Sequence, residues 1–90
     1  MLELTDDAAA AIRDLAGDGV LRLVAHEDDE GVEIETVVAD EPEAGDEVVE
    51  HGGARVALDA IAVEVLDDQI LDAHAHGDHV HFVFSPQQED

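Results

Sequence analysis

Apolar residues near the start of the chain recur at helical spacing. Ala8, Ile12 and Leu15 fall on one face of an α-helix. Thr5 precedes them and is a good N-cap, because its side-chain oxygen can accept a backbone N–H of the first turn. The pattern predicts a helix over residues 6–16 whose apolar face belongs to the core, and the glycines that follow end it.

Strand-like segments follow this helix and are separated by turn residues. They span residues 20–26, 32–37, 46–51 and 54–58. The acidic turn at residues 28–31 allows a hairpin between the first two segments, and Gly52-Gly53 allows a tight reversal between the last two. The acidic segment 39–45 contains proline, so we expect it to be a loop.

A second, shorter helix is predicted after Asp59, which is a suitable N-cap. Apolar residues lie nearly all round this helix, so we expect it to be buried. These residues are Ile61, Val63, Val65 and Leu66. No repeat and no long linker divides the chain, which indicates one domain over residues 1–90 with residues 86–90 as a frayed tail.

The last two strand-like segments, residues 69–76 and 79–85, predict a β-hairpin around Gly77-Asp78. Glycine at the first central position supplies the positive φ of a type II′ turn. This two-residue turn pairs His76 with His79 and His74 with His81, so the four histidines share one face. The other face carries apolar residues that we expect in the core: Ala73, Ala75, Val80, Phe82 and Phe84.

A three-residue loop is the alternative register of this hairpin. It pairs His76 with Val80 and moves His79 to the opposite face, together with the last histidine. It also separates the two alanines of the first strand from the two phenylalanines of the second. The alternation of apolar residues therefore favours the two-residue turn.

The chain is strongly acidic, with 3 arginines, no lysine and 25 acidic residues that give a net charge of −22. Such a charge repels phosphate backbones and anionic lipids, which excludes nucleic acid and membrane surfaces as partners. No apolar stretch is long enough to span a bilayer. The lack of lysine indicates a halophilic source or a GC-rich genome, and composition does not choose between them.

The chain contains no cysteine, which fits a reducing compartment. The first five residues, 1–5, lack the basic and apolar regions of a signal peptide. We therefore expect the protein to be cytoplasmic.

Several short strings occur in order along residues 2–84. They are Leu4-Thr5 before an alanine-rich helix, Leu21-Arg22-Leu23, Asp40-Glu41-Pro42, a glycine-containing turn before Val56, Asp59 before the short helix, Leu66-Asp67-Asp68, Leu71-Asp72 and Phe82-Val83-Phe84. Together they resemble the HesB-like family, the A-type (IscA-like) carriers of iron–sulfur cluster assembly. The resemblance implies a small α+β domain of mostly antiparallel strands, in a compact mixed sheet or sandwich, with an N-terminal helix and one short buried helix.

The cluster ligands of this family have no counterpart in the chain. Its carriers use one cysteine after the first strand and a Cys-Gly-Cys pair near the C-terminus. The first position would fall at residues 28–31, and the chain reads Gln87-Gln88-Glu89-Asp90 where the pair would come. Cluster iron is held mainly by thiolate, so we expect no iron–sulfur cluster here.

The resemblance therefore implies a non-enzymatic binding or accessory module, with a protein of iron–sulfur assembly as its partner. Whether it forms a homodimer depends on an exposed apolar face, which the sequence leaves open. The only serine, Ser85, has no recognisable base beside it in sequence, and Gly52-Gly53 is a lone turn, so we expect no enzymatic activity.

A metal-binding protein is the alternative function. His74, His76, His79 and His81 are the candidate ligands, because cross-strand neighbours lie about 5 Å apart and imidazoles suit Zn, Ni, Cu or Fe(II). Asp72 shares their face and could serve as an outer ligand. The opposing interpretation is that the histidines lie on a solvent-exposed face of the hairpin, where any polar side chain would be tolerated. We interpret His26 and His51, at strand ends, as ordinary surface residues.

Overall fold

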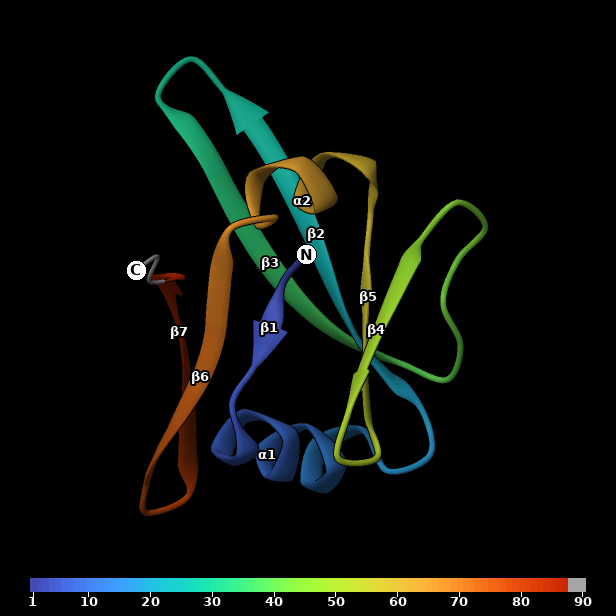
Figure 1. The fold of residues 1–90 in the computed structure, drawn as a ribbon, viewed down its shortest axis with the longest axis vertical. Coiled ribbons are helices and arrows are strands. Elements are labelled where there is room, and N and C mark those ends of the chain that lie inside the picture. The colour runs from blue at the N-terminus through green and yellow to red at the C-terminus, as the bar shows by residue number, and fades with distance from the viewer. Residues whose placement is uncertain (88–90) are drawn as a thin grey trace.

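The computed structural model describes residues 1–87, and these form two helices and two mixed sheets. The elements in chain order are β1 (Glu3–Leu4), α1 (Asp6–Ala16), β2 (Val20–Asp28), β3 (Gly31–Ala39), β4 (Glu47–His51), β5 (Ala54–Leu58), α2 (Ala60–Val65), β6 (Gln69–His76) and β7 (His79–Pro86). One sheet has the strand order β1-β6-β7 and the other β3-β2-β5-β4 (Figure 1). The predicted α+β class is confirmed.

The two sheets share one hydrophobic core. Buried residues of β2 and β5, such as Leu23 and Val56, belong to the same cluster as Leu71 of β6 and Ile12 of α1. Helix α1 lies across one end of the sheets and contacts β6 of one sheet and β5 of the other (Figure 1). Each sheet contains one parallel pair, β1 with β6 and β2 with β5, and its other pairs are antiparallel.

Helix α1 begins and ends where the sequence predicts. The Thr5 side chain accepts a hydrogen bond from the Ala8 backbone N–H (3.1 Å), and the helix stops at Gly17, whose φ is 58°. Ala8 and Ile12 are buried as expected, but Leu15 is 48% exposed. Leu15 differs because it stands on the last turn, beside an open space between α1 and the β6–β7 hairpin.

The prediction that α2 is buried was wrong. Only Ala62 of this helix and Leu66 after it are buried, whereas Ile61 and Val65 are exposed. The helix has six residues and lies at the end of the molecule opposite α1, where it contacts β2 and β5 on one side only (Figure 1). Val63 is partly buried against the core, so the apolar side chains that face outward are those of Ile61 and Val65.

The predicted register of the terminal hairpin is confirmed. His76 pairs with His79 and His74 with His81 across β6 and β7. Gly77 has φ 62°, the positive value that a type II′ turn requires at its first central position, and Asp78 after it is not among the residues with positive φ. Phe82 and Phe84 pack against the core but are only partly buried, and Val80 is exposed because the hairpin tip extends beyond the core.

The end of β7 is held more firmly than the sequence suggested. Pro86 belongs to β7, and the Gln87 backbone N–H donates to the Asp68 carbonyl (2.8 Å). The Gln87 side chain donates to the Met1 carbonyl (2.7 Å). The rest of the expected tail, residues 88–90, lies outside the described residues. No helix within residues 1–87 has the length and apolar character needed to cross a membrane.

All three arginines of the chain tie loops to the fold. Arg13 donates to the Gly52 carbonyl in the β4–β5 turn, and Arg55 donates to the Asp18 carbonyl before β2 (2.8 Å). Arg22 forms two hydrogen bonds with Asp46, in the loop before β4. All three guanidinium groups therefore bind other residues of the same chain, and the surface charge is overwhelmingly negative.

Added salt is therefore expected to raise the melting temperature. The acidic groups repel one another in the folded state, and salt screens this repulsion over about 10 Å at 0.1 M. Thermal melts followed by circular dichroism, from dilute buffer to about 1 M NaCl, measure the effect. If salt acts by screening, the melting temperature should rise most steeply at the lowest salt concentrations. If salt acts because it is excluded from the protein surface, the melting temperature should rise steadily with concentration. A flat melting temperature would contradict the prediction.

Candidate functional site

The four hairpin histidines lie on the outer face of the β1-β6-β7 sheet, and all four are exposed. One contact between their rings runs diagonally across the two strands. The rings of His76 and His81 meet edge to face, with their centroids 5.8 Å apart. The structure thus brings the histidines onto one face, as the sequence predicts, without enclosing them.

Asp72 links this face to the start of α1. Its Oδ1 accepts hydrogen bonds from the Thr5 hydroxyl (2.7 Å) and the Ala73 backbone N–H (2.8 Å). The Thr5 bond, followed by the Ala73 bond, lowers the pKa of Asp72 against an opposing effect of desolvation. Its other oxygen lies 3.7 Å from Nε2 of His74. One oxygen is therefore committed to the N-cap, while the other faces the first histidine of the face.

Within residues 1–87, no three histidine or acidic side chains are positioned together to hold a metal ion. The ring contact involves only two of the four histidines, and nothing covers them. A metal would have to draw the exposed side chains together by rotation. The four-histidine site therefore remains a prediction.

The other two histidines pair with acidic side chains elsewhere. Nε2 of His51 lies 2.9 Å from Oδ1 of Asp6, and Nε2 of His26 lies 3.0 Å from Oε1 of Glu35. Both pairs are exposed, and their expected energetic contribution is small.

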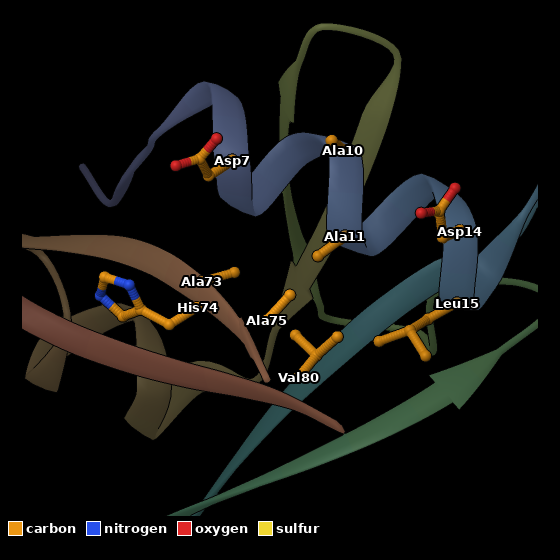
Figure 2. Close-up of a pocket in the computed structure, with 9 residues that line it drawn as sticks. All are labelled: Asp7, Ala10, Ala11, Asp14, Leu15, Ala73, His74, Ala75 and Val80. Carbon is orange, nitrogen blue, oxygen red and sulfur yellow. The ribbon is translucent and has the colours of Figure 1, made fainter. Parts of the chain in front are cut away.

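A trough with a volume of about 400 Å³ lies between α1 and the β6–β7 hairpin, and His74 is one of its lining residues. Ala11 of α1 points toward Ala75 and Val80 of the hairpin, while Asp7 and Asp14 stand toward the two ends of the helix (Figure 2). Sequence reasoning missed this trough, because its alanines look like core residues. The sequence did contain one sign of it, because Asp7 and Asp14 are seven residues apart and therefore lie on the same face of the alanine-rich helix.

The site offers little for covalent chemistry. Within the described residues no polar or charged residue is buried as a whole, and the enclosed carboxylate of Asp46 is already bound by Arg22. Ser85 is exposed on β7, opposite Ile70, and no imidazole or carboxylate pairs with it in the structure of residues 1–87. The surface instead offers an exposed histidine face and an acidic trough.

No family model matches the sequence, and no curated protein matches it. Solved structures do match the fold. Escherichia coli SufA, which is involved in biosynthesis of iron–sulfur clusters, has a TM-score of 0.81 at 28% identity, covering 94% of this chain and 79% of SufA. IscA with its 2Fe–2S cluster has a TM-score of 0.78 at 21% identity, covering 96% of this chain and 85% of IscA. An Aquifex aeolicus protein solved by NMR has a TM-score of 0.73 at 22% identity, covering 93% of this chain and 89% of that protein.

Proposed function

We propose that this chain, a cysteine-less protein with the HesB-like fold of the A-type iron–sulfur cluster carriers, is a non-enzymatic accessory module of cluster assembly that holds no cluster itself. One observation carries the proposal. The likeness to SufA covers 94% of the chain, yet the 90 residues include no cysteine. The module therefore keeps the scaffold of a carrier while lacking its thiolates.

The residues present do not fit an iron–sulfur cluster. Thiolate is the usual ligand of cluster iron, and histidine replaces it only in part. The turn at residues 28–31, where the resemblance puts one ligand, carries an Asp28 carboxylate that accepts the Glu30 backbone N–H (2.8 Å). The proposed role is therefore binding to another protein, not carriage.

The charge of the molecule supports a protein partner that is not anionic. The three arginines are engaged with Gly52, Asp46 and Asp18, and the net charge is −22. A partner in cluster assembly would thus present a neutral or basic surface. The absence of cysteine is compatible with the reducing cytoplasm as the place of this interaction.

Titration of the chain into a cysteine-containing A-type carrier of the same organism tests this role. Analytical ultracentrifugation is expected to show a mixed complex that weakens as salt is added, because the acidic surface contributes to it. The cluster absorbance of the carrier should remain with the carrier. Absence of a complex at low salt, or passage of the cluster to this chain, would contradict the proposal.

A second candidate function is binding of a divalent transition metal by His74, His76, His79 and His81. The observation in its favour is the register, which puts all four on one face with two rings already 5.8 Å apart. Exposed imidazoles can rotate toward one ion, and Zn, Ni, Cu and Fe(II) all accept them. Asp72 would orient His74 through its free oxygen, which lies 3.7 Å from Nε2.

Calorimetric titration of metal-free protein with Zn²⁺ and Ni²⁺ tests this candidate. Saturable binding with a dissociation constant of about 0.1 mM or lower is expected, and it should be lost in His74→Ala and His81→Ala. His26→Ala is the matched control, since it removes an exposed histidine outside the hairpin. Binding that is absent, or equal in all three variants, would eliminate the second candidate.

A further inference from the structure

We propose that the trough between α1 and the β6–β7 hairpin binds a linear organic dication, in which a methylene chain separates two ammonium groups. The trough holds about 400 Å³, within the range of small-molecule sites. This inference does not depend on a role in iron–sulfur assembly. It rests on the apolar floor of the trough and on two acidic groups that flank the floor.

The floor is apolar and built from small side chains. Ala10 and Ala11 line it from α1, while Ala75 and Val80 line it from the hairpin (Figure 2). Alanine leaves space that a longer residue would fill, and Val80 remains exposed. A bare methylene chain removes such a surface from water without requiring any hydrogen bond.

The two carboxylates are spaced along the trough. Asp7 and Asp14 both line it, and seven residues of α-helix correspond to a rise of about 10.5 Å. This separation is too long for one metal ion to join both groups, whose oxygens bind at about 2.0–2.6 Å. It suits two cationic groups on one extended chain.

Both carboxylates are available to a ligand. Neither Asp7 nor Asp14 forms a side-chain hydrogen bond or ion pair with any residue of the described part of the chain. Their neighbour Asp6 is different, because His51 lies 2.9 Å from it. The net charge of −22 also raises the local concentration of cations.

The occupant must combine two positive charges with an apolar link. An anion would meet the two aspartates, and a monoamine would leave one of them unused. His74 of β6 also lines the trough (Figure 2). Its Nε2 lies 3.7 Å from Oδ2 of Asp72, so His74 has an acidic neighbour other than the two aspartates of the trough.

Calorimetry on the full chain with diaminooctane and diaminobutane tests the proposal. Both are dications, so the general negative field attracts them equally, but only the longer one spans the two aspartates. Diaminooctane is expected to bind about tenfold more tightly. Equal affinities would overturn the proposal, because they would show that both diamines are bound only through the overall negative charge of the protein.

Charge-matched variants locate the site. Asp7→Asn with Asp14→Asn should weaken diaminooctane binding about tenfold. Glu30→Gln with Glu33→Gln removes the same charge from the β2–β3 hairpin and should change binding less than about twofold. Equal losses in the two double variants would contradict the proposal.

A third variant blocks the trough without changing its charge. Ala10 is exposed, so Ala10→Phe should fold normally while filling the space above the floor. We expect it to remove the preference for the longer diamine, with circular dichroism as the check of folding. An unchanged preference in Ala10→Phe would overturn the proposal even if the aspartate variants were unstable.

Discussion

Replacing Arg22 with alanine is expected to destabilise the fold by about 3 kcal/mol or more. Arg22 Nε donates to Asp46 Oδ2 (2.8 Å) and its terminal nitrogen donates to Oδ1 (3.1 Å), a fork that holds both carboxylate oxygens. The Asp46 side chain is only 3% exposed and that of Arg22 14%. Without the arginine, the Asp46 carboxylate would stay almost inaccessible to water and would lose its main partner.

The same pair joins the loop before β4 to the outer face of the β3-β2-β5-β4 sheet. Asp46 Oδ2 also accepts the Glu43 backbone N–H (3.0 Å), so the carboxylate closes the loop as well as binding Arg22. Glu43 itself lies 3.4 Å from Arg22 but is 73% exposed, and its contribution should be small. Loss of Arg22 therefore removes the anchor of the whole loop.

The penalty for losing Arg22 should depend on pH. The hydrogen bond from Arg22, more than any other effect, lowers the pKa of Asp46 below its ordinary 3.8. A carboxyl whose pKa is depressed on folding contributes stability above its unfolded pKa and loses it as pH falls through the folded value. The difference between wild type and Arg22→Ala should therefore be full near neutral pH and shrink below pH 3.8.

Urea unfolding of Arg22→Ala at neutral and acidic pH measures this effect. Arg55→Ala is the control, since Arg55 makes one exposed hydrogen bond to the Asp18 carbonyl, worth about 1 kcal/mol or less. Equal destabilisation by the two substitutions would contradict a special role for the Arg22–Asp46 pair. So would a penalty that is unchanged in acid.

Leu23→Ala is the second substitution with a large expected effect, a loss of about 2–5 kcal/mol. Leu23 is 0% exposed and lies on β2 between Thr36 of β3 and Leu58 of β5. The core contains few aromatic residues, and Leu23 is among its largest fully buried side chains. Truncation would leave a cavity that its β-sheet neighbours cannot easily fill.

Thermal and urea unfolding in moderate salt measure the loss. For a domain of this size the melting temperature should fall by about 10 °C or more. Val37→Ala is the matched control, because Val37 lies on the adjacent strand β3 and is 39% exposed. The central role of Leu23 would be contradicted if both substitutions lowered stability by the same amount.

Local patterns predicted the strands well where one face is buried. The β6–β7 register follows from the Gly77-Asp78 turn and from the alternation that ends in Phe82 and Phe84. A slip by one residue would have moved every apolar side chain to the wrong face. The likeness of the chain to the HesB-like carriers also followed from short strings, and the SufA comparison confirms it at the level of the fold.

Features that depend on tertiary placement could not be predicted in the same way. Strand β1 has two residues and pairs in parallel with β6, joining Glu3 to Ile70 across the length of the chain. The exposure of Ile61 on α2 and of Leu15 on α1 depends on where each helix meets the sheets. The trough depends on the position of the hairpin beside α1, which no periodicity reveals.

The absence of cluster binding is the central claim, and anaerobic reconstitution tests it most directly. The chain and IscA, whose solved structure contains a 2Fe–2S cluster, would be incubated side by side with iron and sulfide, desalted, and assayed for visible absorbance and for iron and sulfide per chain. We predict that IscA retains a cluster, while this chain emerges colourless with only traces of iron and sulfide. A stable absorbing cluster with near-stoichiometric iron and sulfide on this chain would contradict the account.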